Sequence, residues 1–188
     1  AVMRRFRDAH PDVTLTLETV PRRELPRRLD GQAFDLGFVA LPCTYPSAGM
    51  VPIRGFEGVC ILPETHPIAE LRRVPLARLA DVPLIALPPG TVWRTRVESA
   101  FYELALPFRP AIEAQTEIAD LVRAGLGIAI VDPFTATTAK LPGVTSREIT
   151  PAIAYEMAIL YPIARPRSHL AESFAGVALE LAQTALQG

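Results

Sequence analysis

The most informative stretch of this chain is Gly125-Leu126-Gly127-Ile128-Ala129-Ile130-Val131-Asp132-Pro133. An amphipathic segment, residues 117–124, precedes this stretch, and the β-branched run within the stretch ends in proline. That order predicts a helix, a glycine that ends the helix, a buried strand and a loop. In open α/β sheets, ligands collect beyond the carboxyl ends of the strands, where helix N-termini also point. The stretch therefore marks either a ligand-binding edge or an ordinary turn of an α/β domain.

Composition limits the classes of protein that the chain can belong to. Its 188 residues are enough for one domain or two small lobes with a substantial core. Charged residues interrupt every long apolar run, so no segment reaches the ~20 apolar residues of a membrane helix. The net charge is −1 and no basic stripe occurs, so we expect this segment itself to bind neither a membrane nor DNA. Residues 1–6 lack the apolar core of a secretory signal, and we expect a cytoplasmic protein.

The sequence contains no pattern typical of a catalytic, redox or metal-binding site. Cys43 and Cys60 lie far apart, which favours two reduced thiols over a disulfide or a redox switch. His10, His66 and His169 are scattered, so we expect no metal. The sequence has no nucleophile elbow, no nucleotide-binding glycine motif and no evident pair of catalytic acids. We therefore expect no catalytic residue, no cofactor and no enzyme activity.

The periodicity of apolar residues predicts helices and strands in alternation. Predicted helices cover residues 2–9, 22–29, 92–104, 117–124, 134–138 and 170–185. Predicted strands cover residues 13–18, 34–39, 58–62, 83–87, 111–114, 127–131, 144–149 and 153–161, the last two as a pair around Thr150-Pro151. This order predicts a mainly parallel sheet with helices on both faces.

Four segments carry a combined pattern that extends over essentially the whole chain. They cover residues 6–17 (Phe-Arg-Asp-Ala-His-Pro-Asp-Val, then alternation), 24–38, 62–69 (Leu-Pro-Glu-Thr-His-Pro-Ile-Ala) and 121–130. Together these segments resemble the effector-binding domain of LysR-type transcriptional regulators. Two shorter runs, residues 59–63 and 131–136, are similar to members that sense amino acids and opines.

The resemblance implies a fold class, an α/β fold like that of type 2 periplasmic binding proteins. Two Rossmann-like lobes would be joined by two crossing strands, with the effector in the cleft between the lobes. Lobe one is expected over residues 1–60 and 164–188, and lobe two over residues 61–163, with the crossings near residues 60–62 and 160–162. The family's helix-turn-helix DNA-binding domain and the first strand of lobe one are expected to be missing from this chain.

The resemblance also implies partners. The domains would pair side by side as homodimers, through the first helix and a helix of lobe two, and full-length proteins would form tetramers. DNA would be bound only through the N-terminal domain that we expect to be absent here.

The first candidate binding group lies at the predicted start of the helix over residues 92–104. Helix N-termini supply donors to anions without a balancing charge. Thr91, Trp93 and Arg94 add a hydroxyl, an indole N–H and a guanidinium that can hold a carboxylate bidentately. The alternatives are that Thr91 only caps the helix, that Arg94 is solvated and that Trp93 packs in the core.

Further candidates lie at a second helix start and at two strand ends. Thr116 either contacts the ligand or caps the helix, and Glu117 either meets an ammonium group or favours the helix dipole. Asp132 follows a buried strand and needs a partner, which is either a ligand or the local backbone. The remaining candidates follow strands and offer backbone groups and apolar surface: Phe38, Val39 and Ala40 from lobe one, and Pro133 and Phe134 after Asp132.

These observations lead to a functional hypothesis. We expect a sensor domain of a bacterial regulator that binds a small carboxylate or an amino-acid-like effector in the interlobe cleft. Binding would shift a pre-existing equilibrium between conformations. The main alternative is a solute-binding protein of a transport system, and a thiol-based redox sensor is a third.

Overall fold

The computed structural model describes residues 1–138 and 141–187. The chain divides into two compact units: unit 1 comprises Ala1–Arg54 and Glu156–Gly188, and unit 2 comprises Gly55–Tyr155. It passes from one unit to the other after Arg54 and again after Tyr155. Both passages lie earlier in the chain than the lobe boundaries expected at residues 60 and 163.

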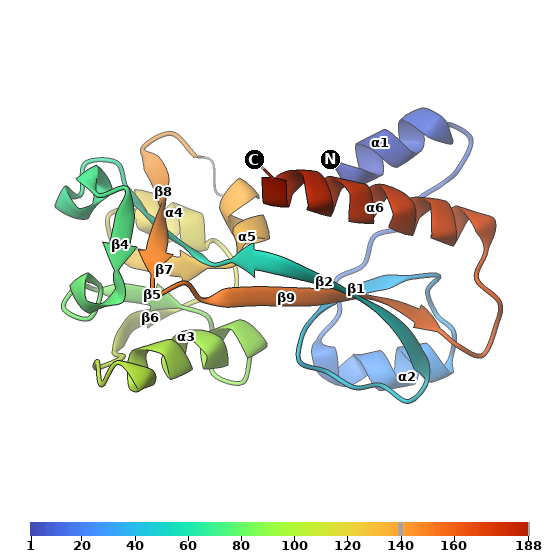
Figure 1. Cartoon of the computed structure of the whole chain (residues 1–188), viewed down its shortest axis with the longest axis horizontal. Coiled ribbons are helices and arrows are strands. Elements are labelled where there is room, and N and C mark those ends of the chain that lie inside the picture. The colour runs from blue at the N-terminus through green and yellow to red at the C-terminus, as the bar shows by residue number, and fades with distance from the viewer. Residues whose placement is uncertain (139–140, 188) are drawn as a thin grey trace. The chain divides into compact units, whose positions relative to one another are not determined.

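Unit 1 is a three-stranded sheet with helices (Figure 1). Its strands have the order β1-β9-β2, and β1 runs antiparallel to β9 with Gly37 opposite Leu160. Phe6 of the first helix is 1% exposed and lies 5.1 Å from Phe174 of the last helix, ring centre to ring centre. The elements are α1 (Val2–Ala9), η1 (Arg22–Glu24), α2 (Leu25–Asp30), β1 (Gly37–Ala40), β2 (Ala48–Glu57), β9 (Ala154–Pro162) and α6 (His169–Gln187), of which β2 and β9 extend into unit 2.

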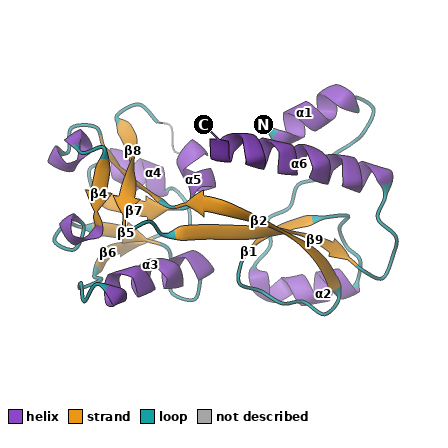
Figure 2. Cartoon of the chain, in the orientation of Figure 1, coloured by secondary structure: helices purple, strands orange, loops and turns teal. Residues whose placement is uncertain are grey.

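Unit 2 is built on a six-stranded sheet of order β4-β8-β3-β7-β5-β6. Figure 2 shows strands in orange and helices in purple. The elements are β3 (Val59–Pro63), η2 (Pro67–Glu70), β4 (Arg73–Pro75), η3 (Leu76–Arg78), β5 (Leu84–Ala86), α3 (Val92–Glu103), β6 (Pro110–Glu113), α4 (Ile118–Arg123), β7 (Ile128–Val131), α5 (Pro133–Thr138) and β8 (Val144–Thr150).

The sheet of unit 2 is mixed. Strand β5 runs parallel to β6 and β7, and β4 runs parallel to β8, but β3 is antiparallel to both β7 and β8. The expectation of a mainly parallel sheet is therefore wrong at its centre, because β3 enters between two strands of the opposite direction. The parallel group β7-β5-β6 still brings three strand ends to one edge.

Successive residues of β7 show how the core is divided. Ile128 and Ile130 face the cluster that contains Val97 and Phe101 of α3, whereas Ala129 and Val131 face the cluster that contains Ile118 and Val122 of α4. Side chains alternate across a strand, so helices cover both faces of this sheet. The predicted α/β class is confirmed.

Two predictions about individual strands are wrong, and one strand was not predicted. Residues 13–18 form no strand, since their alternation has no strand partner and Leu17 is 76% exposed. Strand β2 was not predicted, because Gly49, Pro52 and Gly55 interrupt its apolar pattern. Strands β8 and β9 do not pair around Thr150-Pro151, because β8 joins the sheet of unit 2 and β9 that of unit 1.

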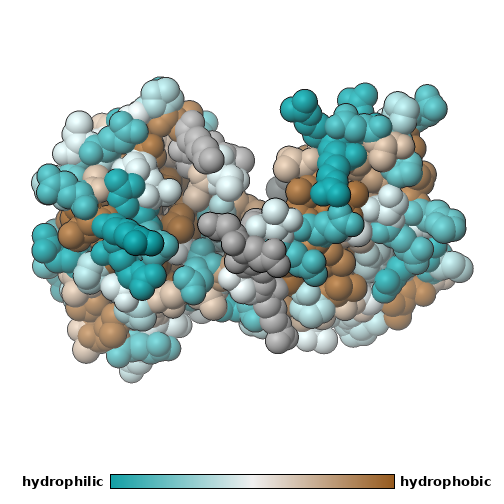
Figure 3. All heavy atoms as spheres, turned by 45° about the horizontal axis from the view of Figure 1, so that its top comes forward, coloured by the Kyte–Doolittle hydropathy of each residue, from teal (hydrophilic) through white to brown (hydrophobic). Residues whose placement is uncertain are grey.

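The visible faces of both units are largely hydrophilic, with apolar residues in small groups (Figure 3). Within the described residues, none of the helices has the length and apolarity required to cross a membrane.

Candidate functional site

The carboxyl ends of β5, β6 and β7 form one edge of the sheet in unit 2, which we call the carboxyl edge. From this edge the chain continues into three helices, α3, α4 and α5. The structure thus brings to one edge most of the residues that the sequence predicted as ligand contacts: Thr91, Trp93, Arg94, Thr116, Glu117, Asp132, Pro133 and Phe134.

Trp93 lies inside the fold at the start of α3. It is 5% exposed, and its indole Nε1–H donates a 3.0 Å hydrogen bond to the Ile130 carbonyl. A Cβ atom on Gly58 would lie 2.3 Å from Cη2 of the Trp93 ring, so only glycine leaves room for the indole. Core packing, one of the two readings of Trp93, therefore describes its place in the structure.

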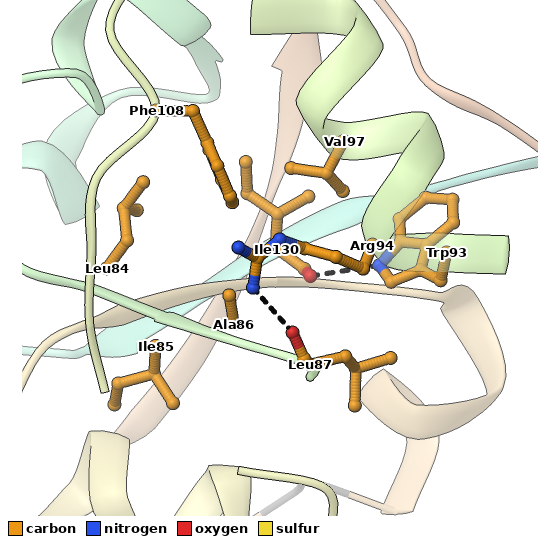
Figure 4. Close-up of a pocket in the computed structure, with 9 residues that line it drawn as sticks. All are labelled: Leu84, Ile85, Ala86, Leu87, Trp93, Arg94, Val97, Phe108 and Ile130. Atoms are coloured by element: carbon orange, nitrogen blue, oxygen red, sulfur yellow. Dashed lines mark hydrogen bonds between the residues drawn. The ribbon is translucent and has the colours of Figure 1, made fainter. Parts of the chain in front are cut away.

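Arg94 is buried as well, although it carries a charge. Only 6% of it is exposed, and its guanidinium lies 4.7 Å above the Phe108 ring. Its Nη1 donates to the Leu87 carbonyl at 2.7 Å (Figure 4). Nη1 also donates to Glu113 Oε1 at 3.0 Å, and Nε donates to Glu98 Oε1 at 2.7 Å. The reading of Arg94 as solvated is wrong, and the carboxylates that it binds here belong to the protein.

The cavity beside Arg94 is small. It measures about 10 Å³ and is lined mainly by apolar side chains of β5, α3 and β7 (Figure 4). That volume is about enough for a single water molecule. A structural role for Arg94, which links α3 to the ends of β5 and β6, accounts for its contacts; its recognition of an effector stays a prediction.

Thr91 caps α3. Its Oγ1 accepts a hydrogen bond from the Arg94 backbone N–H and donates one to the Pro88 carbonyl, both at 3.3 Å. Threonine is favoured at this position because its oxygen satisfies an otherwise unpaired backbone donor. The capping reading of Thr91 is confirmed, and contact with an effector stays a prediction.

The start of α4 differs from the start of α3. Thr116 and Glu117 are both exposed. The N-cap is Glu117 rather than Thr116, and the Glu117 side chain makes no capping hydrogen bond. Its φ is +60°, a left-handed conformation that costs a non-glycine residue about 1 kcal/mol or more. The exposed carboxylate therefore faces solvent on a strained backbone.

Asp132 organises the start of α5. Its Oδ1 accepts hydrogen bonds from the Phe134 and Thr135 backbone N–H groups at 3.0 Å, and its Oδ2 accepts one from Thr135 Oγ1 at 2.6 Å. Pro133 fills the first helical position, where its missing N–H costs nothing. Of the two readings of Asp132, bonding to the local structure describes what is seen.

Phe134 belongs to an aromatic cluster that we define as Phe56, Trp93, Phe134 and Tyr155. Ring centres lie 4.8 Å apart for Phe56–Phe134, 5.9 Å for Phe134–Tyr155 and 5.5 Å for Trp93–Tyr155, each in an edge-on arrangement. Phe134 is 39% exposed, whereas Phe56 is 7% exposed. The cluster thus offers one apolar face to solvent at the carboxyl edge.

Sequence reasoning missed Phe56 and Tyr155 in this cluster. Burial raises the pKa of the Tyr155 hydroxyl to about 12; the carboxylate of Asp132 also raises it, and Arg96 lowers it. Tyr155 lies in a predicted strand and Phe56 in a segment without a predicted element. Periodicity does not indicate which rings meet, so no sequence signal identified the pair.

The predicted contacts of lobe one lie on β1 in unit 1. Val39 is 8% exposed and packs with Ala158 and Leu160, so its side chain belongs to the core. Phe38 is 44% exposed, and its ring centre lies 6.5 Å from that of Phe174. Ala40 is partly buried at the carboxyl end of the strand.

The two cysteines are free. Burial raises the pKa of the Cys60 thiol to about 12, and it raises that of Cys43 against the opposing effect of Arg22. A high pKa makes a thiol a poor nucleophile at neutral pH. Over residues 1–138 and 141–187, no group of three or more His, Cys, Asp or Glu side chains is placed to hold a metal ion.

Comparison with known families identifies the type of domain. A model of the LysR substrate binding domain matches residues 1–183. Regulatory protein NocR of Agrobacterium tumefaciens (strain T37) is 31% identical over 181 residues, which are 95% of this chain and 60% of NocR. The transcriptional activator protein LysR of Escherichia coli (strain K12) is 27% identical over 173 residues, 91% of this chain and 56% of that protein. The chain spans about three fifths of the length of these relatives.

Solved structures with the same fold include effector-binding domains. The regulatory domain of Synechocystis PCC6803 CcmR, in complex with 2-PG, has a TM-score of 0.79 at 18% identity, covering 97% of this chain and 89% of that one. The BenM effector binding domain with its effector benzoate has a TM-score of 0.79 at 19% identity, covering 98% and 85%. These likenesses confirm the predicted fold class, that of the two-lobed, periplasmic-binding-protein-like effector domains.

Proposed function

Because this chain belongs to the LysR substrate binding domain family, we propose that it is the effector-sensing part of a bacterial transcriptional regulator and that its effector contacts the carboxyl edge of unit 2. One observation supports this position for the effector. Three parallel strands end at this edge and lead into three helices, and Thr116, Glu117 and Phe134 are exposed there.

The proposed effector is a small amino-acid-like molecule or another small carboxylate. An aromatic face at Phe134, a hydroxyl at Thr116 and a carboxylate at Glu117 would suit a ligand with both an apolar part and a cationic group. Arg94 already binds Glu98 and Glu113. Asp132 and Thr91 likewise accept hydrogen bonds from backbone N–H groups at the starts of α5 and α3. The backbone N–H groups at the start of α4, where the N-cap side chain makes no hydrogen bond, are therefore better placed to meet an effector carboxylate.

The wider assembly follows from the family. The chain would act in a longer, cytoplasmic regulator that reaches DNA through a separate N-terminal domain. It would pair as a homodimer through α1 and a helix of unit 2, and the full-length protein would form a tetramer. The relatives are named as regulators, which does not favour the alternative of a transport protein.

A ligand screen tests the proposal. Trp93 is the single tryptophan and lies 5.5 Å from the Tyr155 ring, so its fluorescence reports on the aromatic cluster. Amino acids, opines and aromatic acids are titrated while the melting temperature and Trp93 emission are recorded. We expect an effector to raise the melting temperature, since binding to the native state stabilises it by RT ln(1 + [L]/Kd).

Two variants locate the binding site of any effector found. Phe134→Ser should weaken its affinity by about tenfold or more, through loss of the exposed aromatic face. Tyr102→Ser, which changes a residue 85% exposed on α3, should leave the affinity unchanged. If Phe134→Ser binds the effector as tightly as the unsubstituted chain and Tyr102→Ser do, the effector does not contact the carboxyl edge. A screen in which no ligand stabilises the chain would argue against the sensor role.

A further inference from the structure

The aromatic cluster touches both points at which the chain passes between its two units. Phe56 is the second residue of unit 2, after Gly55, and Tyr155 is its last residue. Both pack against Phe134 at the start of α5. One partly exposed side chain at the carboxyl edge therefore contacts both crossing strands, β2 and β9.

Two glycines flank Phe56 in the crossing segment, and each has a specific structural reason to be glycine. Gly55 has φ +95°, a conformation that side chains disfavour, and Gly58 leaves the space that the Trp93 ring occupies. The Gly58 N–H donates a 2.8 Å hydrogen bond to the Ile153 carbonyl, which ties the crossing segments to each other beside the cluster. A shift of Phe56 or Tyr155 therefore acts directly on this link.

The cluster is also fixed from the sheet. Trp93 packs on Tyr155, and its indole N–H is bonded to the Ile130 carbonyl of β7. Asp132, which holds the start of α5, follows that strand directly. The rings thus connect the end of β7 to the two crossing segments, and closely packed groups transmit displacement.

We propose that the aromatic cluster transmits effector contact at Phe134 to the two chain crossings at Phe56 and Tyr155. This inference rests on the proposed function for the position of the effector. The coupling itself is a property of the chain without any ligand, because packed contacts act in both directions.

Amide hydrogen exchange of the ligand-free chain, read by NMR, tests the coupling. In Phe134→Ala, the Gly58 amide should exchange about tenfold faster or more, because loss of the ring loosens the crossing segments locally. In the control Tyr102→Ala, which changes an exposed aromatic side chain of α3, its exchange should change by less than about twofold. A Gly58 amide unaffected in Phe134→Ala, with faster exchange only in α5, would overturn the proposal.

A reciprocal variant keeps the test decisive if Phe134→Ala does not fold. Phe56→Leu retains an apolar side chain and should speed exchange of the α5 amides by about threefold or more. Unchanged α5 amides would equally overturn the proposal. Neither measurement uses an effector, so a failed ligand screen and a failed coupling are separate results.

Discussion

The starts of α3 and α5 lie at the same edge of the same sheet, yet their side chains differ in burial and in hydrogen bonding. At α3, Trp93 and Arg94 are 5% and 6% exposed and have carbonyl or carboxylate partners within the protein. At α5, Asp132 holds the backbone and Phe134 remains 39% exposed. Hydrogen-bond donors at a helix start therefore do not by themselves identify a ligand contact. The start of α3 has the stronger donors, but they already bond to carbonyl and carboxylate groups of the protein.

The largest expected effect concerns the buried arginine of α3. Arg94→Ala should lower the free energy of unfolding by about 2–3 kcal/mol, measured by urea denaturation, since it removes packing and leaves the Leu87 carbonyl without its guanidinium donor. Arg123→Ala removes an exposed pair with Asp120 and should cost under about 0.5 kcal/mol. A stable Arg94→Ala variant that loses effector binding would reverse the contrast between the two helix starts.

The next effect concerns the glycine beneath the indole. Gly58→Ala should destabilise the chain by about 1–3 kcal/mol, since its methyl group overlaps the Trp93 ring. Displacement of the ring should also shift Trp93 emission to longer wavelength. Gly176→Ala is a control of opposite sign: a Cβ there meets nothing within 4 Å, and alanine inside α6 should stabilise the chain by about 0.5–1 kcal/mol. Unchanged emission and stability in Gly58→Ala would show that the ring is not held as described.

A smaller effect is expected at the cap of α5. Asp132→Ala should cost about 1 kcal/mol in thermal or urea unfolding, since it removes the acceptor of two backbone N–H groups. Asp132→Asn retains one acceptor oxygen and should cost less. If both substitutions leave stability unchanged but abolish effector binding, Asp132 acts on the ligand rather than on the helix.

The smallest expected effect concerns Glu117 at the start of α4, where two substitutions distinguish the role of backbone strain from that of the carboxylate charge. Glu117→Gly should stabilise the chain by about 0.5 kcal/mol, because glycine accepts the positive φ without strain. Glu117→Ala keeps the strain and should leave the free energy of unfolding nearly unchanged. If the carboxylate meets a cationic group of the effector, the two variants should weaken binding equally in the fluorescence titration.

Local patterns were sufficient for most elements, and pairing was where they failed. The run around Gly127 predicted the order of α4, β7 and α5, because helix caps and buried strands have local signatures. Strands β8 and β9 were wrongly paired, since alternation reveals which face a strand buries but not its neighbour. Strand β2 has Pro52 and two glycines where alternation was needed, so it carried no signal.

The site was predicted as a location more than as a set of contacts. Helix starts and strand ends were recognised, and the structure brings them to one edge of unit 2. The partners of Arg94 lie 4, 7 and 19 residues away in sequence, and whether a charged side chain is buried depends on such contacts. Phe56 and Tyr155 meet Phe134 only through the tertiary fold, beyond the reach of periodicity.

The strand order of unit 1 bears on how the protein is made at the ribosome. Strand β9 lies between β1 and β2, but it is synthesised roughly 100 residues after β2, once the continuous segment of unit 2 has emerged. Until then β1 and β2 lack their shared neighbour and expose unpaired backbone groups to other nascent chains. We therefore expect unit 2, whose segment is continuous, to fold first during translation, and a ribosome that stalls before β9 to leave unit 1 prone to aggregation.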